Sequence, residues 1–140
     1  MMRFLVALLT TFVLVACGTA PAARDRSHPR NVSLDPAVEF LLTSAATDFH
    51  THRASYPARF RNVRSGYFVT VEGTRQYRLC GEFLPAQQGG EAEWTRFATI
   101  TTDPYEQWLG GQTAPFCDSS VTWHRGDLSS LLQSRLDALR

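Results

Sequence analysis

Two histidines, His50 and His52, are the residues of this chain whose type first suggests a metal site, because imidazole is the commonest transition-metal ligand. They lie where a helix is expected. Helical residues two apart point about 200° away from each other, so both rings could hold one ion only if the helix had already ended. No third ligand lies nearby in the sequence, and we therefore expect no metal.

Hydrolytic chemistry is the second possibility. A serine, histidine and aspartate triad can be assembled only on paper, from Ser119 or Ser120, His124, and Asp118 or Asp127. No Gly-x-Ser-x-Gly elbow or comparable signature accompanies these residues. Glu91 and Glu93 are the best close carboxylate pair, but they lie beside a glycine loop and are expected to be exposed to solvent. The sequence predicts no catalytic residue and no cofactor, hence a protein that is not an enzyme.

Arginines dominate the segment from His50 to Arg78, where six of them face a single acid, Glu72. If Arg59 and Arg61 share a strand face while Phe60 points inward, a basic surface stripe results. Its candidate binding residues are Arg59, Arg61, Arg64, Arg75 and Arg78. They could bind the phosphates or carboxylates of lipopolysaccharide, peptidoglycan or an acidic protein partner. The alternative is internal pairing of these arginines, with Asp48, Glu82, Glu91 and Glu93.

Three tryptophans, Trp94, Trp108 and Trp123, also have two interpretations. They could form an exposed aromatic platform for a glycan. In a domain of this size, however, we expect them in the core, because their large apolar area is usually buried.

The N-terminus carries a location signal. After Met1-Met2-Arg3, an uncharged run from Phe4 to Ala16 leads to Leu14-Val15-Ala16-Cys17, which resembles the lipobox of bacterial lipoproteins. The resemblance implies a diacylglyceryl thioether on Cys17, cleavage before it, and acylation of the new amino group with a fatty acid such as palmitate. Gly18 favours the outer membrane, facing the periplasm. The alternatives are an uncleaved anchor over residues 4–23 and ordinary cleavage after Ala22, which would release a soluble protein.

The remaining cysteines, Cys80 and Cys117, form a single pair in an oxidising compartment. A disulfide between them would stabilise the fold by about 4 kcal/mol in the chain-entropy model, since it closes a long loop. No Cys-x-x-Cys sequence supports a redox role.

The predicted organisation is a signal peptide at 1–16, a lipidated cysteine and flexible tether at 17–34, and one domain at 35–140. The signal contains one of the 14 basic residues, all arginine, which leaves thirteen against 13 acidic residues. With a net charge near zero the chain has no bulk preference for nucleic acid.

Secondary-structure signals within the domain favour an α+β fold. Asp35-Pro36 predicts the start of an amphipathic helix that ends near His52. Strand-like runs follow at 59–64, 67–71, 76–84 and 93–100, with a hairpin turn at Glu72-Gly73. Asp103-Pro104-Tyr105-Glu106 predicts a short helix. Asp127 is expected to cap a C-terminal amphipathic helix.

The run 76–84 has apolar residues on both faces. If Tyr77, Leu79, Gly81 and Phe83 face the helices, Cys80 projects to the opposite side. We therefore expect the segment ending at Cys117 to fold over that second face, where the disulfide pins it to a small antiparallel sheet.

Two sequence motifs carry a family resemblance. Pro57-Ala58-Arg59-Phe60-Arg61-Asn62-Val63, followed by Cys80-Gly81-Glu82 and a second cysteine, resembles a group of small exported or lipid-anchored proteobacterial proteins. The resemblance covers 55–117 and implies the architecture and the cysteine pair, not a mechanism. The chain departs from the pattern at 83–86. We expect a lipid-anchored accessory or interaction protein that recognises an envelope protein or an anionic glycan.

Overall fold

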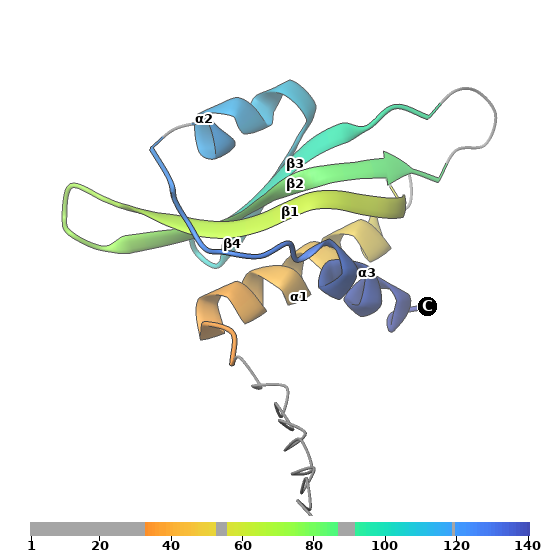
Figure 1. Cartoon of the computed structure of the whole chain (residues 1–140), viewed down its shortest axis with the longest axis horizontal. Helices are drawn as coiled ribbons and strands as arrows, with labels where there is room; N and C mark the ends of the chain where they lie inside the picture. The colour runs from red at the N-terminus through yellow and green to blue at the C-terminus, as the bar shows by residue number, and fades with distance from the viewer. Residues whose placement is uncertain (1–32, 53–55, 87–91, 119) are drawn as a thin grey trace, which may run out of the picture. The chain divides into compact units, whose positions relative to one another are not determined.

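Five antiparallel strands in the described residues form one sheet in the order β4-β3-β2-β1-β5 (Figure 1). The computed structural model describes residues 33–52, 56–86, 92–118 and 120–140. The strands are β1 (Pro57–Val69), β2 (Arg75–Pro85), β3 (Thr95–Thr101), β4 (Tyr105–Leu109) and β5 (Thr122–Trp123). The helices are α1 (Pro36–Thr51), α2 (Ala114–Cys117) and α3 (Ser129–Asp137), with a 3₁₀ turn η2 (Gly110–Thr113) before α2. These elements and the disulfide confirm the α+β class.

Predictions about the N-terminal segment lie outside the described residues. This applies to the signal peptide, to Cys17 and to the tether as far as Val32. No helix in the described part of the chain combines the length and the apolar content needed to cross a bilayer.

α1 begins and ends where the sequence predicts. The Asp35 carboxylate accepts a hydrogen bond from the Ala37 backbone N–H at 2.9 Å, and Pro36 occupies the first turn. At the other end the N–H of His52 donates to the Asp48 carbonyl. Because the apolar residues recur every three or four positions, α1 buries one face against the sheet.

Phe49 of α1 lies at the centre of the hydrophobic core. Its ring centroid is 4.9 Å from that of Phe83, 5.3 Å from Phe60 and 5.4 Å from Phe97, so it contacts three strands at once. α3 adds the buried residues Leu132 and Leu136. We call this side of the sheet, against which α1 and α3 pack, the helix face.

The two strands predicted at 59–64 and 67–71 are one strand, β1, interrupted by a bulge. Arg61 pairs with Glu82 and Arg64 with Cys80, so Asn62 and Val63 together oppose Gly81. Asn62 adopts a positive φ of 55°, which asparagine tolerates better than most residues. A Cβ on Gly81 would lie 2.8 Å from Val63 Cγ2 and 2.9 Å from Phe97 Cε1, so this position requires glycine.

The helix predicted from Asp103-Pro104 is wrong, because those residues form the turn of a hairpin. The Thr102 N–H donates to the Pro104 carbonyl at 3.2 Å, and Tyr105–Leu109 then pair with β3 as strand β4. Leu109 packs against the core while Trp108 projects to the other side. The same Asp-Pro signal starts helices and turns, and the pairing of β3 decides between them.

α2 covers the opposite side of the sheet, which we call the disulfide face (Figure 1). Cys80 and Cys117 form the predicted disulfide, with an S–S distance of 2.03 Å and a Cα–Cα distance of 6.0 Å. The Arg78 Nη1 group donates to the Phe116 carbonyl at 2.5 Å. The Phe116 ring stacks on Trp108 with centroids 5.4 Å apart. The second layer therefore depends on one covalent bond and a few contacts.

The predicted cap of the C-terminal helix, Asp127, lies one residue before the observed N-cap, Leu128. The Asp127 carboxylate accepts from the Ser129 N–H at 2.7 Å. α3 ends at Asp137, so Leu139 lies beyond the helix and is exposed.

Candidate functional site

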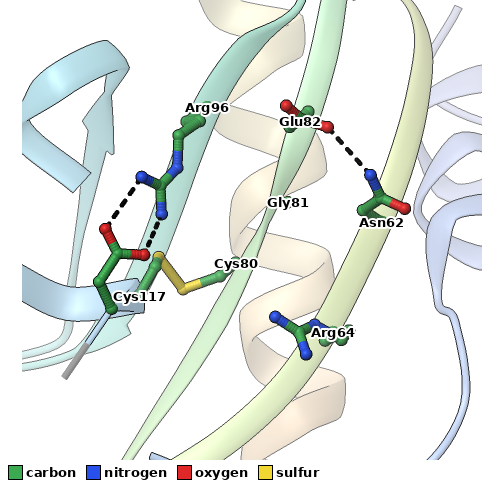
Figure 2. A pocket seen from close by; sticks show the side chains of 8 residues that line it. Asn62, Arg64, Cys80, Gly81, Glu82, Arg96 and Cys117 are labelled. Carbon is green, nitrogen blue, oxygen red and sulfur yellow. Dashed lines mark hydrogen bonds and ion pairs between the residues drawn. A yellow bond between two sulfur atoms is a disulfide. The ribbon is translucent and has the colours of Figure 1, made fainter. Parts of the chain in front are cut away.

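A polar pocket of about 160 Å³ opens on the disulfide face (Figure 2). Its lining residues are Asn62 and Arg64 from β1, Cys80, Gly81 and Glu82 from β2, Arg96 from β3, and Cys117 and Asp118 at the end of α2. The pocket lies where the bulge of β1 opens the sheet next to the disulfide. Figure 2 shows Arg64 and Arg96 on opposite sides of the sulfur atoms.

The bulge places the pocket's charged groups. Without it, strand alternation would put residues 61 and 64 on opposite faces. Because Asn62 and Val63 share one partner, Arg61 and Arg64 both reach the disulfide face while Phe60 and Val63 both enter the core. The Asn62 amide then donates to Glu82 Oε2 at 3.0 Å, which ties the bulge to β2.

Two arginines beside the pocket are paired with carboxylates. Arg61 Nε donates to Glu82 Oε2 at 2.7 Å. Arg96 makes a bidentate pair with Asp118, with distances of 3.0 and 2.5 Å. The bond from Arg61 holds the pKa of Glu82 below its ordinary value, and the bond from Arg96 lowers the pKa of Asp118. Both pairs are solvent-exposed, so they position side chains more than they stabilise the fold.

Arg64 differs from these two. Its guanidinium carbon lies 4.5 Å from the centroid of the Trp123 ring. Within the described part of the chain it forms no ion pair with a carboxylate. A guanidinium stacked on an aromatic face keeps its edge N–H groups available for bidentate bonding. Gly66 permits this arrangement, because a Cβ there would lie 2.9 Å from Trp123 Cε3.

The remaining arginines of the predicted stripe occupy separate environments. Arg59 lies 5.8 Å from the Trp94 ring and Arg75 lies 4.5 Å from the Tyr67 ring. Arg78 is 2% exposed and stacks on Phe68, so it does not belong to a surface stripe. The five arginines thus lie against four different aromatic rings, because Arg59 and Arg61 share Trp94. Internal pairing, the alternative prediction, holds for Arg61 with Glu82.

The prediction that the three tryptophans are core residues is wrong. Trp94, Trp108 and Trp123 are all half-buried. Each lies under or against another side chain: Trp94 under Arg61 at 4.1 Å, Trp123 under Arg64, and Trp108 against Phe116. Their rings support arginines and the α2 layer, while phenylalanines fill the core.

Three described residues of the triad assembled on paper, Asp118, Asp127 and His124, bond to other partners. Asp118 binds Arg96, and Asp127 accepts a hydrogen bond from the Ser129 N–H. His124 Nδ1 lies 3.1 Å from the hydroxyl of Ser65, which is 4% exposed. Ser119 and Glu91 lie outside the described residues. In the remainder, no three His, Cys, Asp or Glu side chains cluster as metal ligands would, and His52 Nδ1 contacts the Asp48 carbonyl at 3.0 Å.

Sequence reasoning missed the bulge and therefore the pocket. One signal was present, since the buried residues Phe60 and Val63 are three apart with an asparagine between them. In a strand without a bulge, two residues on the same face are separated by two or four positions. The pairing of Arg96 with Asp118 and the stacking of Arg64 on Trp123 join distant segments, and no local pattern predicts them.

A comparison with known protein families, curated proteins and solved structures finds no match to this chain.

Proposed function

We propose that this protein is a lipid-anchored module of the bacterial cell envelope, on the outer membrane facing the periplasm, that works by binding rather than by catalysis. Its partner is an envelope protein that presents an acidic side chain to the pocket beside the disulfide. The lipobox resemblance at Leu14–Cys17 supports the location. The side chains around Arg64 support the binding role.

The observation that carries the proposal is the state of Arg64. Its neighbours Arg61 and Arg96 are occupied by Glu82 and Asp118. Arg64 stands at the same pocket, held on Trp123, with no carboxylate partner in the described residues. A charged donor oriented by stacking loses little conformational freedom on binding, and it matches the planar geometry of a carboxylate.

The pocket also indicates the charge of the group it takes. Two wall carboxylates, Glu82 and Asp118, are each balanced by one arginine, so Arg64 supplies one net positive charge. A single carboxylate balances that charge. A dianionic phosphate would leave one negative charge unbalanced.

A second candidate function is binding of an anionic envelope component, peptidoglycan or lipopolysaccharide. The supporting observation is that Arg59, Arg64 and Arg75 form no carboxylate pair within the described residues. Dispersed cations of this kind favour a polyanion over a single group. Sedimentation with purified peptidoglycan or lipopolysaccharide would then fall steeply as salt screens the charges.

Titration of the ¹⁵N-labelled full chain with the blocked tripeptide Gly-Glu-Gly tests the principal function. We expect shifts at the Arg64 Nε–H and at the amides of Asn62 and Gly81. The blocked Gly-Gln-Gly peptide should bind at least about tenfold more weakly, since a hydrogen bond between charged groups contributes about 1.5–3 kcal/mol. Arg64→Gln should cause a similar loss. Arg125→Gln, which changes an exposed arginine outside the pocket, is the matched control.

Equal binding of the glutamate and glutamine peptides, or binding that survives Arg64→Gln, would rule out this site. Inorganic phosphate serves as a third ligand. If phosphate shifts the same signals more strongly than the glutamate peptide, the second candidate function is favoured.

A further inference from the structure

The outer edge of β1 is closed along only part of its length. β5 pairs with Gly66 and Tyr67. The chain after β5 continues the closure, because the His124 N–H donates to the Ser65 carbonyl and the Leu128 N–H donates to the Val63 carbonyl. The Val63 N–H donates to the Ser129 hydroxyl at 3.1 Å. In the part of the chain that the structure describes, no backbone group pairs with residues 57–62 on this side.

A groove of about 440 Å³ lies beside this open edge. α3 packs against β1, with Ser129 near Val63 and the C-terminal Arg140 bonded to the Tyr56 hydroxyl at 2.7 Å. The helix therefore runs antiparallel to the strand. The groove is lined by Arg59 and Phe60 from β1 and, from α3, by Ser129, Ser130, Gln133, Ser134 and Asp137. Their spacing places the helical residues on one stripe that faces the strand.

The groove contains unused polar groups. Gln133 Oε1 is buried and has no hydrogen-bond partner among the described residues, while its amide nitrogen donates to Asp137 Oδ1 at 3.2 Å. A buried acceptor without a donor costs free energy until a donor reaches it. Arg59 forms no ion pair with a carboxylate in the described part of the chain. Asp137 is already bonded to Arg140 at 3.3 Å.

We propose that an extended, acidic segment of a protein partner docks in this groove and adds as a strand to residues 57–62 of β1. Main-chain hydrogen bonds to the strand edge supply the affinity, and the facing helix supplies side-chain contacts. An acidic side chain of the docked segment pairs with Arg59. Six residues of β1 span about 20 Å, which sets the length of the docked segment. This site is separate from the Arg64 pocket.

Two other occupants fit the charges less well. A second copy pairing edge to edge would place Arg59 and Arg61 of one chain against the same residues of the other, and opposed like charges destabilise strand pairs. The N-terminal segment of the same chain carries Arg24, Arg26 and Arg30 with one acid, Asp25. An acidic partner complements Arg59, whereas this basic segment does not.

NMR titration of the ¹⁵N-labelled full chain tests the proposal. The probe is a blocked hexapeptide of alternating threonine and valine with one central glutamate. We expect amide shifts confined to residues 57–62 and α3. N-methylation of alternate peptide nitrogens on the bonding edge should weaken binding at least about tenfold, because it removes the strand hydrogen bonds.

Variants with a reversed charge distinguish binding in this groove from binding at the Arg64 pocket. Arg59→Glu should weaken binding of the glutamate peptide about tenfold and should favour the same peptide with lysine in place of glutamate. Arg125→Glu is the matched control, and this variant should bind the glutamate peptide with the wild-type affinity. Arg64→Gln should leave the groove shifts in place even if it abolishes tripeptide binding at the pocket, so the two proposals fail independently.

Three results would overturn the proposal. Shifts that lie elsewhere would show that the groove is not the site. Equal affinity of the N-methylated peptide would exclude strand addition. A wild-type dimer that Arg59→Glu converts to monomer, measured by sedimentation, would show that a second copy occupies the edge.

Discussion

Replacing both Cys80 and Cys117 by serine is expected to lower the free energy of unfolding by about 4 kcal/mol. The bond joins residues separated by 37 positions. Closing a loop of that length removes about that much conformational freedom from the unfolded chain. Many domains of this size have a total stability of only about 5–15 kcal/mol. The loss should be visible as a large drop in the urea midpoint.

The structure adds a local consequence to this loss. α2 reaches the sheet through Cys117, and Asp118 beside it holds Arg96. Without the disulfide the α2 layer loses its covalent attachment, and the pocket loses two of its walls. Cys17→Ser in the full chain expressed without lipidation is the matched control, because it removes a thiol outside residues 33–140. A double serine variant with the wild-type midpoint would contradict the role assigned to this bond.

Phe49→Ala should destabilise the fold by a similar amount, about 4 kcal/mol, because it leaves a cavity among three rings. Phe49 is 1% exposed and packs against Phe60, Phe83 and Phe97. Urea unfolding followed by tryptophan fluorescence measures the change.

Phe40 provides the control on the same helix. It is 42% exposed and makes one edge contact, to Tyr105. Phe40→Ala should cost less than about 1 kcal/mol. If Phe49→Ala is too unstable to fold, Phe49→Leu should still unfold at a lower urea concentration than Phe40→Ala. Equal losses for the two alanine variants would show that Phe49 is not the centre of the core.

Local signals predicted the parts of the fold that depend on local physics. Asp35-Pro36 starts α1 because the Asp35 carboxylate caps the first turn. Asp127 accepts a hydrogen bond from the N–H of Ser129, the first residue of α3, although Leu128 is the N-cap. Gly73, with a φ of 81°, allows the predicted hairpin turn. Cys80 projects away from the helices because its strand neighbours Leu79 and Phe83 are drawn into the core.

The predictions were wrong where the local sequence is compatible with two structures and contacts with distant segments decide between them. Tyr105–Leu109 form a strand because β3 offers them a free edge, which the sequence of the segment alone does not reveal. The tryptophans are only half-buried, because four phenylalanines, Phe49, Phe60, Phe83 and Phe97, fill the interior. The site shows the same contrast. The sequence alone singles out its arginines as candidate binding residues. It does not predict the bulge that brings Arg64 beside the disulfide, because that bulge depends on Gly81 of another strand.

The two proposed contacts lie on different parts of one scaffold. β1 contributes Arg64 to the disulfide face and its open edge to the α3 groove. A partner that bound at both places would have a higher affinity than either contact gives alone. Once the first contact has formed, the second forms within the same complex. Such a surface suits the membrane-anchored module that we propose, because a membrane concentrates its partners.

Formaldehyde cross-linking in intact bacterial envelopes tests the binding role most directly. The wild-type chain and the Arg125→Glu control should capture the same partner protein in equal yield. Arg64→Glu, which reverses the charge at the pocket, should reduce that yield several-fold while the amount of folded protein stays constant. Capture of no partner above background, or an undiminished yield with Arg64→Glu, would contradict the proposal that the Arg64 pocket is where the partner binds.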